Sequence, residues 1–583
     1  MKWILRDQLN KKQIDHFPEI NPIVVQLLHN RGLDTQQEID QFLTPDYSQD
    51  IHDPYLFNQM QAAVDRIFLA KKNKEKICVF GDYDVDGVTG SAIISTFLAE
   101  HNFNYTCYIP HRDREGYGLN DQAVDKIAQT GASLIITVDC GISNGAEIKI
   151  AKDKHKIETI IVDHHDLPKK QPPAVAIVHA RLPKEKYPYK MLSGGGTAFK
   201  LVQGLLRDKS LKYDQATIES KEKWLLDLVA LSTIGDMMPL LGENRTLVKY
   251  GLIVLGKTRR LGLQKLMEGA GVDLNQMNTQ KVGWQINPRL NAAGRLQHAN
   301  LAYQLVMTDN IEQAIMMSSE LNKSNQERQK LTEQYVKEAD QQVQKQLERG
   351  NQALIAYNDD WAPGVLGLVA GRLSSRYYRP VYALTKLDNK YVASGRSIAE
   401  YNITESLEDN KELFIKYGGH PVACGFSIEE EKLSLFVKQL TKYSQNKLSK
   451  MKLEPQIWID SEIKLIDCNW DLYRFLEDFE PFGGSNEEPL FLIRGLAVTD
   501  WQTVGKDSKH LRIYVKQGEV IKKAIAFGLG EWAKELKIDS QIDIVCKLGV
   551  NEWNGNRELQ ITIEDLKLTP VAGQKASIAS KDK

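Results

Sequence analysis

Short apolar runs alternate with longer segments typical of helices in the first half of the chain. The apolar runs occupy residues 77–80, 105–110, 134–138, 159–163 and 176–180. This alternation predicts βαβ units, and therefore a mostly parallel sheet with helices on both faces. Open sheets of this kind bind ligands at the carboxyl ends of their strands, and polar residues follow several of the runs. We expect an α/β catalytic domain over residues 71–300.

The segments on either side of this domain have other patterns. Residues 1–70 are polar, with Pro45 and Pro54 as helix breakers, and are expected to form a helical extension packed on the next domain. Residues 301–349 contain no Gly or Pro and are followed by a Gly, which predicts a long connecting helix. Its apolar positions do not keep a heptad, so a strut between domains is favoured over a coiled coil.

Two further domains and a tail complete the chain. Residues 350–447 return to alternating strand-like and helix-like runs, which predicts a smaller α/β domain. Residues 455–570 consist of short alternating segments separated by turn residues, which favours an antiparallel barrel or sandwich. Residues 571–583 are polar and are predicted to be disordered. The expected fold class is α/β, with a C-terminal β-barrel added.

Composition narrows the class of protein. No apolar run approaches the roughly 20 residues that a membrane-spanning helix needs, and no secretory signal is visible, so we expect a cytoplasmic protein without membrane contact. The six cysteines include no C-x-x-C pair, which argues against a zinc cluster. The net charge of −1 is mildly unfavourable for a nucleic-acid partner, although it hides local patches.

An acidic loop follows the first apolar run. Asp82, Asp84 and Asp86 alternate with other residues and precede Gly87, so at least two of the carboxylates can converge on one point. Their mutual repulsion favours cations between them, and Mg²⁺ or Mn²⁺ suits oxygen ligands. A calcium loop of the EF-hand type would need Glu at its twelfth position, which is Ile93. A solvated acidic turn remains the other alternative.

Further carboxylates and imidazoles follow later apolar runs. Asp139 ends one run, Asp163 is followed by His164 and His165, and Asp236 lies in an apolar setting. Each Asp alone is more often a cap than a ligand. Together they predict a centre for two divalent cations about 3.5–4 Å apart, which is typical of phosphoester hydrolysis.

These motifs resemble a known superfamily. GDYDVDG, VDCGIS, VDHHD and GDMMPL, in this order and spacing, are similar to the DHH phosphoesterases. Motifs at 110–119, 193–201, 287–295, 394–397 and 417–425 further resemble the branch of bacterial exonucleases that degrade single-stranded DNA from 5′ to 3′. The resemblance covers about residues 1 to 570. It implies a DHH domain, a DHHA1-like domain and a C-terminal OB-fold.

The resemblance also implies roles for individual residues. It implies two Mn²⁺ or Mg²⁺ ions held by Asp84, Asp86, Asp139, His164 and Asp236. Asp139 would bridge the ions, Asp82 and Asp163 would orient ligands, and His165 would contact the scissile phosphate. A metal-bound hydroxide would then attack, so no protein nucleophile is needed. This chain has Phe80 where smaller DHH phosphoesterases have a His.

Other residues are expected along the path of the substrate. Arg112 and Arg289 are implied to contact the scissile phosphate, since guanidinium groups bind phosphate through paired hydrogen bonds, and Asn291 lies in the same loop as Arg289. In the second α/β domain, Ser394, Arg396 and Ser397 are expected to grip a terminal 5′-phosphate. The resemblance implies that His420 faces the substrate, and a glycine turn with a satisfied His is the alternative. In the barrel, Trp501 and Tyr514 are candidates for stacking on bases. For a single surface Arg, a solvated side chain is the commoner explanation.

The resulting hypothesis is a metal-dependent exonuclease for single-stranded DNA, acting from 5′ to 3′ in DNA repair and recombination. The family further implies a single-strand-binding protein and a helicase as partners, and we expect a monomer. One alternative is a DHH phosphodiesterase for short oligoribonucleotides or a nucleotide second messenger, which the additional barrel disfavours. The other is an inactive scaffold, which should lack ligands, whereas this chain has the whole set.

Overall fold

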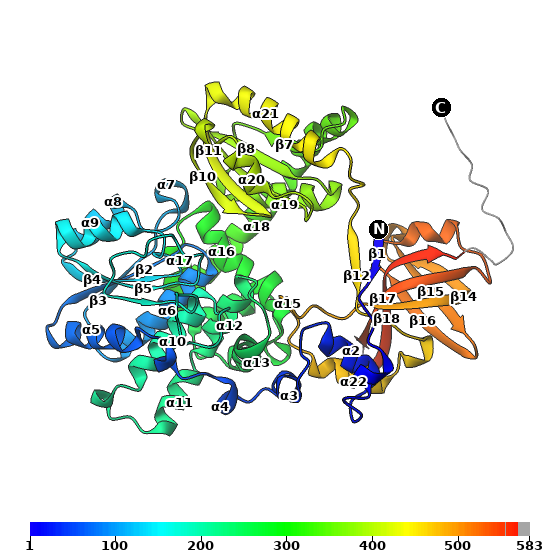
Figure 1. Ribbon diagram of the computed structural model, residues 1–583, viewed down its shortest axis with the longest axis horizontal. Helices are drawn as coiled ribbons and strands as arrows, with labels where there is room; N and C mark the ends of the chain where they lie inside the picture. The colour runs from blue at the N-terminus through cyan, green and yellow to red at the C-terminus, as the bar shows by residue number, and fades with distance from the viewer. Residues whose placement is uncertain (554, 570–583) are drawn as a thin grey trace. The chain divides into compact units, whose positions relative to one another are not determined.

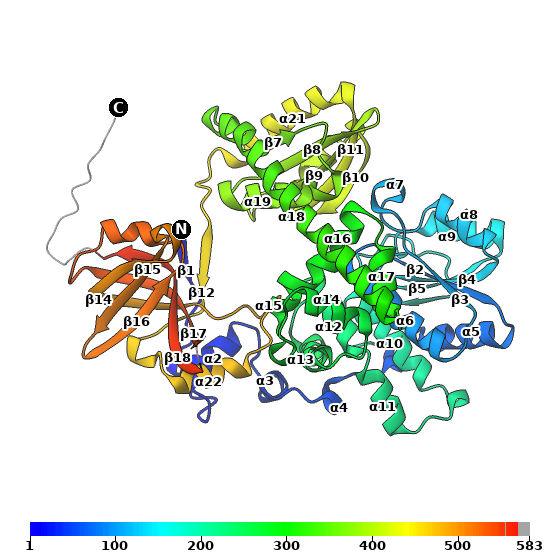
Figure 2. The ribbon, with the colours of Figure 1, turned by 180° about the vertical axis from the view of Figure 1, so that it is seen from behind.

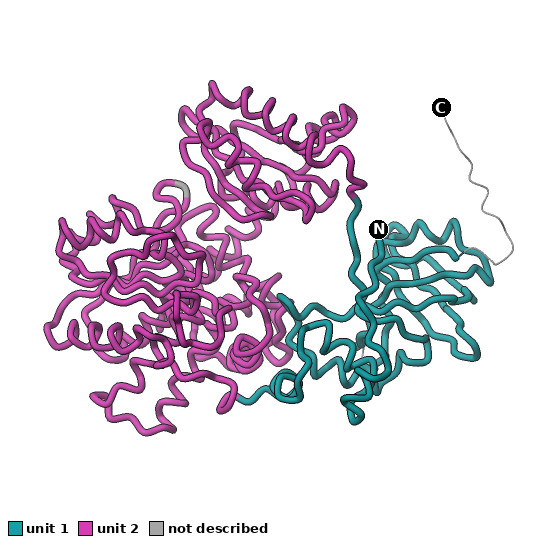
Figure 3. The backbone as a smooth tube through the Cα atoms, in the orientation of Figure 1, with its two compact units in different colours: residues 1–46, 454–583 teal, residues 47–453 magenta. Residues whose placement is uncertain are grey.

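The computed structural model describes residues 1–553 and 555–569, apart from the side chains of Asp113 and Trp553. The tail predicted to be disordered, 571–583, lies outside the described residues. The chain forms two compact units, one of residues 47–453 and one of residues 1–46 with 454–583 (Figure 3). Among the described helices, none is long and apolar enough to cross a membrane.

The larger unit contains the predicted parallel sheet. Its strands are β2 (Lys76–Gly81), β3 (Tyr105–Tyr108), β4 (Ala132–Val138), β5 (Glu158–Val162) and β6 (Ala176–Val178). The order β3-β2-β4-β5-β6 is parallel throughout, so all five apolar runs are confirmed as strands. Because successive strands are added on opposite sides of β2, the loops after β2 and β4 diverge and leave a crevice, where ligands bind in sheets of this kind.

Helices cover both faces of this sheet (Figure 1). On one face α5 (Met60–Lys72), α6 (Val85–Glu100) and α10 (Gly194–Leu206) contribute to the largest apolar core. On the other face α8 (Asp121–Gln129) and α9 (Gly145–His155) enclose a second core. Further helices extend the first layer: α12 (Leu226–Gly235), α13 (Gly242–Gly256), α14 (Leu261–Gly269) and α16 (Asn287–Leu296). The α/β fold class is thus confirmed.

A long helix, α18 (Ile311–Glu348), joins this part to the second α/β part (Figure 2). The segment expected as one helix over 301–349 is broken, because α17 (Asn300–Met307) forms separately and the Asn310 side chain caps α18 by accepting hydrogen bonds from the amides of Glu312 and Gln313. One face of α18 is buried against α14, α16 and α17, and later residues contact β7 and α19.

The second sheet lies in the same unit. Its strands are β7 (Leu354–Tyr357), β8 (Val381–Leu387), β9 (Lys390–Arg396), β10 (Phe414–His420) and β11 (Ala423–Glu429), in the order β10-β11-β9-β8-β7. Only β7 and β8 pair in parallel. The helices α19 (Leu366–Tyr377) and α21 (Glu430–Leu448) pack on it with apolar residues.

The smaller unit is built around a closed barrel. Its strands are β14 (Phe491–Val504), β15 (His510–Gln517), β16 (Val520–Ala526), β17 (Gln541–Trp553) and β18 (Asn556–Leu568). Pairing runs β14-β15-β16-β18-β17, and β17 pairs again with β14, which closes the ring. Closure leaves no unpaired strand edge in the ring. The barrel predicted from the alternating segments is confirmed.

The N-terminal segment differs from the expected helical extension. Residues 2–5 form a strand, β1, that pairs in parallel with β12 (Gln456–Ile459). Trp3 packs beside Ile459, and its indole Nε1 donates to the Asp565 carboxylate at 2.8 Å. Residues 1–46 therefore belong to the barrel unit, and only the rest of the expected extension joins the catalytic domain. The domain boundaries set from the sequence remain predictions.

Candidate active site

The loop after β2 folds tightly enough to converge its carboxylates. Asp84 caps α6, because its carboxylate accepts hydrogen bonds from the backbone N–H of Asp86 at 2.9 Å and of Gly87 at 3.2 Å. Gly87 lies so close to Asp82 that an added Cβ would sit 2.5 Å from the Asp82 nitrogen. The glycine that ends D-x-D-x-D-G is therefore a steric requirement of this close approach between the start of the helix and the end of the strand.

Asp86 is the most firmly held of these carboxylates. Its side chain is buried, and it accepts hydrogen bonds from the Gly194 and Gly195 amides at 2.7 Å each. The hydroxyl of Ser232 donates to the same oxygen as Gly195. The other oxygen, Oδ2, faces Nε2 of His164 at 3.6 Å. Oδ2 therefore keeps one direction in which it could bind a metal ion, and the amides at the start of α10 fix the orientation of the carboxylate.

Three carboxylates surround the imidazole of His164. Asp139 follows β4 in a left-handed backbone conformation, and its Oδ1 is 3.1 Å from His164 Nε2. Asp236 ends α12, and its Oδ2 is 3.5 Å from the same nitrogen. With Asp86, these side chains come from three separate elements and meet beside one imidazole. Burial lowers the pKa of His164, so the ring is neutral and suited to bind a metal.

The predicted ligands form three overlapping groups whose ligand atoms lie within 4.8 Å of one another. The groups are Asp86, His164 and Asp236; Asp139, His164 and His165; and Asp82, Asp84 and Asp139. All five ligands predicted from the sequence are therefore brought together, with Asp82 and His165 beside them.

The charges of this cluster fit bound divalent cations. The buried Oδ1 of Asp82 accepts no hydrogen bond from any residue that the structure describes. Burial and the charge of Asp84 raise the pKa of Asp82 well above its usual value, and burial with Asp86 and Asp84 raises the pKa of Asp236 to about 8. Cations between these groups would remove the repulsion, and hard oxygen ligands suit Mg²⁺ and Mn²⁺.

His165 has a different environment from His164. Its Nδ1 lies 2.8 Å from the Asp163 carboxylate, which also accepts hydrogen bonds from the Ile142 and His164 amides. Burial opposes the charged ring, but the bond to Asp163 and its charge raise the pKa of His165 to about 9. The Tyr117 hydroxyl lies 3.1 Å from the same nitrogen. His165 is therefore a cation at neutral pH, held by Asp163.

A cavity lies between the two α/β parts of the larger unit. It has a volume of about 310 Å³, and Arg112, Ser394 and Arg396 are among the residues that line it. Arg112 also lies over the Tyr83 ring, inside the acidic loop. Ser397 does not line this cavity, and its hydroxyl donates to the Tyr401 carbonyl at 2.6 Å. His420 is exposed at the end of β10, next to a glycine of the cavity wall.

The other predicted substrate residues have partners of their own. Arg289 and Asn291 lie in helix α16 and not in the expected loop, because Pro288 falls in the first turn of the helix, where a proline is tolerated. Nε of Arg289 donates to Oδ1 of Asn322 on α18 at 2.6 Å, and Asn291 accepts from the amide of Val85 at 2.8 Å. Trp501 and Tyr514 belong to the barrel unit, where both side chains are half-buried.

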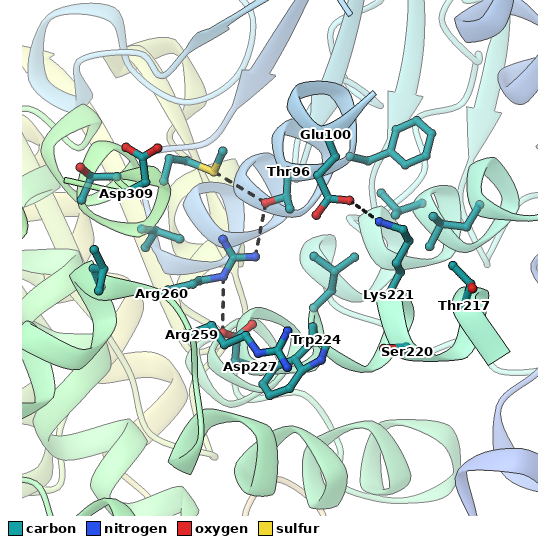
Figure 4. Close-up of a pocket in the computed structure, with 18 of the residues that line it drawn as sticks. Thr96, Glu100, Thr217, Ser220, Lys221, Trp224, Asp227, Arg259, Arg260 and Asp309 are labelled. Carbon is teal, nitrogen blue, oxygen red and sulfur yellow. Dashed lines mark hydrogen bonds and ion pairs between the residues drawn. The ribbon is translucent and has the colours of Figure 1, made fainter. Parts of the chain in front are cut away.

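A larger cavity lies elsewhere in the larger unit, among its helices (Figure 4). It has a volume of about 880 Å³ and is lined by helices, including α6 and α10. Four of its charged groups form two ion pairs, Lys221 with Glu100 at 2.9 Å and Arg260 with Asp227 at 3.4 Å. None of the three ligand groups reaches it, so cavity size does not locate the chemistry here.

Comparison with known proteins agrees with this geometry. The chain matches the models of the DHH family N-terminal domain over residues 76–233, the DHHA1 domain over 350–446 and the RecJ OB domain over 459–565. It is 35% identical over 571 residues to the single-stranded-DNA-specific exonuclease RecJ of Bacillus subtilis, covering 97% of this chain and 70% of the relative. The chain belongs to the RecJ family.

Other members of the family extend the likeness to nearly the full length. The Escherichia coli RecJ exonuclease is 32% identical over 583 residues, with 96% of this chain and 99% of the relative covered. The crystal structure of Thermus thermophilus RecJ in complex with Mn²⁺ is 27% identical, has a TM-score of 0.82 and covers 98% of this chain and 80% of that one. The complex of the same protein with Mg²⁺ has a TM-score of 0.75 at 26% identity, with 98% of this chain and 79% of that one covered.

Several residues of the site escaped the sequence reasoning. Ser232 orients Asp86, and Tyr117 contacts His165. Arg295, whose Nη1 donates to the Gly364 carbonyl at 3.0 Å, lies close enough to Asp84 to feel its charge. All three occur in or beside recognised motifs. Because each acts on another side chain and not on a bound ion or substrate, the spacing of residues in the sequence gives no sign of its role, and only the contacts in the structure show it.

Proposed function

We propose that the chain is a metal-dependent exonuclease that hydrolyses single-stranded DNA from the 5′ end, in DNA repair and recombination. The observation that carries this proposal is the convergence of carboxylate and imidazole ligand atoms within 4.8 Å in three overlapping groups. The proposed substrate is supported by the similarity to RecJ relatives that are single-stranded-DNA-specific exonucleases. The proposed metals are supported by the solved RecJ complexes with Mn²⁺ and Mg²⁺.

The proposed metal centre holds two Mn²⁺ or Mg²⁺ ions. Asp84, Asp86, Asp139, His164 and Asp236 would hold these ions, and Asp139, whose ligand atoms belong to two of the three groups, would be shared between them. Bound in this way, a pair of divalent ions activates water and stabilises the departing oxygen of a phosphodiester. The protein contributes the fixed ligand directions, since the amides of Gly194 and Gly195 hold Asp86 in place.

His165 is the proposed contact to the scissile phosphate. Its ring is held by Asp163 at 2.8 Å and carries a positive charge at neutral pH. A charged N–H donates a strong hydrogen bond to a phosphate oxygen, and this bond strengthens as negative charge develops during hydrolysis. Arg112 and Arg289 are proposed to contact the same phosphate from α7 (Arg112–Glu115) and α16.

The cavity of about 310 Å³ is the proposed site of the terminal 5′-phosphate. Ser394 and Arg396 supply a hydroxyl and a guanidinium group, and the Arg396 Nη1 lies 3.2 Å from the Ser394 hydroxyl. A phosphate bound here would place the chain end at a fixed distance from the metal centre, which sets the direction of digestion. Asn291, Ser397 and His420 are proposed to support this region.

The barrel is proposed to guide the strand. OB-folds bind single strands by stacking bases on aromatic side chains, and Trp501 and Tyr514 are the proposed platforms. We further propose that the enzyme is a cytoplasmic monomer, with a single-strand-binding protein and a helicase as partners, as the family implies.

The test is a product assay on single strands labelled at either end, with Mn²⁺ present. We expect mononucleotides from the 5′ end, and no activity in the Asp139→Asn variant, which keeps the shape of the side chain. Digestion from the 3′ end would contradict the proposed polarity. Rapid hydrolysis of dinucleotides with no attack on long strands would favour the phosphodiesterase, and inactivity with every metal would favour the scaffold.

A further inference from the structure

Arginine side chains gather where the two α/β parts of the larger unit meet. The group consists of Arg112, Arg289, Arg295, Arg328, Arg372 and Arg396, and we call it the arginine cluster. It draws on α7, α16, α18, α19 and β9. Within the described side chains, no carboxylate lies within ion-pair distance of any of these six guanidinium groups. By contrast Arg376, one turn beyond Arg372 on α19, pairs with Asp340 at 2.7 Å.

Two asparagines on the buried face of α18 orient part of the cluster. Asn322 and Asn325 are three residues apart, so they lie on the same side of the helix. Oδ1 of Asn322 accepts from Arg289 Nε at 2.6 Å, and Oδ1 of Asn325 accepts from Arg328 Nη2 at 2.9 Å. Arg328 is therefore held as Arg289 is, by an asparagine of α18, and that asparagine lies one turn further along the helix.

Helix α19 brings Arg372 to the same region. An added Cβ at Gly367 would lie 2.9 Å from Arg396 Nη2, and one at Gly371 would lie 3.8 Å from Arg396 Cγ. The backbone of α19 thus runs against Arg396, and Arg372 is the next residue after Gly371. Arg372 is exposed, whereas Arg328 is half-buried.

The cluster is electrostatically unbalanced. Burial, together with the charges of Arg372 and Arg289, lowers the pKa of Arg328. Burial, with Arg112, Arg328 and Arg396, lowers the pKa of Arg295 to about 9. Like charges held together in a partly buried region are unfavourable unless an anion lies between them. Because the cluster spans several elements, one phosphate cannot contact all of it, and a chain of phosphates is the better match.

We propose that Arg328 and Arg372 bind backbone phosphates of the single strand beyond the nucleotide being removed. This inference rests on the proposed function, in which Arg112, Arg289 and Arg396 serve the terminal and scissile phosphates. Of the other three, Arg295 donates to the backbone carbonyl of Gly364. Arg328 and Arg372, on α18 and α19, do not line the cavity of the terminal phosphate, so a longer strand reaches them and a dinucleotide does not. They are positioning residues that increase affinity for long strands.

The experiment measures binding without cleavage. Fluorescence anisotropy in EDTA follows 5′-phosphorylated oligodeoxynucleotides of two lengths, a dinucleotide and a dodecanucleotide, at several salt concentrations. Arg328→Gln and Arg372→Gln should each weaken binding of the longer strand roughly tenfold or more. The slope of log K against log salt should fall by about 0.7 for each phosphate contact removed, hence about 1.4 in the double variant. Dinucleotide affinity should not change.

Arg376→Gln is the matched control, because it removes the same charge from the same helix where Asp340 already neutralises it. It should leave affinity and slope unchanged. Equal slopes in wild type and double variant, or an equal loss with the dinucleotide or the control, would overturn the proposal. Arg372 is exposed, so its variant tests the idea even if Arg328→Gln does not fold.

The outcome separates this inference from the proposed function. With Mn²⁺, the variants should raise KM for long strands and keep kcat. A wild-type protein that binds with the expected slope but cleaves no strand would refute the exonuclease and keep the phosphate contacts. A wild-type protein that cleaves, with variants of unchanged KM and slope, would refute the contacts and keep the exonuclease.

Discussion

Ser232 is predicted to set the affinity of the metal centre although it is not itself a proposed ligand. Its hydroxyl donates to the Asp86 carboxylate, which the Gly194 and Gly195 amides also hold at 2.7 Å. Ser232→Ala removes one of three donors and leaves the carboxylate held by the two amides alone, so its orientation is less firmly fixed. Its negative charge and its place in the cluster remain, so the change acts on orientation.

The size of the effect follows from the bond that is lost. A hydrogen bond to a charged group contributes about 1.5–3 kcal/mol, and each 1.4 kcal/mol is about a factor of ten in binding. Loss of an outer partner of a metal ligand commonly costs about 10–100-fold in metal affinity or activity. We therefore expect the Mn²⁺ concentration for half-maximal activity to rise by about 10–100-fold. At saturating Mn²⁺, kcat should return close to the wild-type value.

The assay is a Mn²⁺ titration of exonuclease activity, with calorimetric titration of Mn²⁺ as an independent measurement. Thr246→Ala is the matched control, because the buried Thr246 hydroxyl also donates to a carboxylate, that of Asp50 at 3.0 Å. It should lower stability and leave metal affinity unchanged. If Ser232→Ala bound Mn²⁺ as tightly as wild type, or lost kcat at saturating metal, the reasoning from orientation would be refuted.

Two further predictions concern stability and the terminal phosphate. Lys200 and Glu243 form a fully buried ion pair at 2.6 Å. Lys200→Met leaves the buried carboxylate without its positive partner, so it should lower the free energy of unfolding by about 3–5 kcal/mol, measured by urea titration. A loss below about 1 kcal/mol would contradict this. Gly367→Ala should displace Arg396 and raise KM for 5′-phosphorylated strands, whereas Gly371→Ala, with room for its Cβ, should not; equal KM values would contradict the placement.

The parallel sheet and the barrel were predictable because their patterns are local. Each strand of the sheet is a continuous apolar run, since it is buried on both faces. The long helix was predictable in kind, but its start depends on Asn310, a cap that a composition without Gly or Pro does not reveal. The pairing of β1 with β12 joins segments at distant positions in the chain, and no local pattern encodes such a contact.

The motifs predicted which carboxylates and imidazole would meet, and the structure brings them together, but the contacts that hold each one could not be predicted. The spacing of Asp84 and Asp86 placed both in one loop, yet it could not show that they differ in role within that loop. Asp84 caps α6 through two amides, whereas Asp86 receives its donors from α10 and α12. Those helices are distant in sequence, and their contribution is a product of packing. The motifs therefore predict which carboxylates come together, and the structure shows which donors orient them.

The larger unit keeps two opposite charge excesses close together without letting them neutralise each other. Asp84 and Asp82 feel the charges of Arg295 and Arg112, but no ion pair forms among these described side chains. Had the arginines paired with the carboxylates, each site would have lost its ligand. Because they do not pair, the excess charge of the carboxylates is balanced by bound cations, and that of the arginines by a bound anion. A phosphodiester strand with divalent ions at the bond to be cut supplies both at once, and neither ligand alone does so.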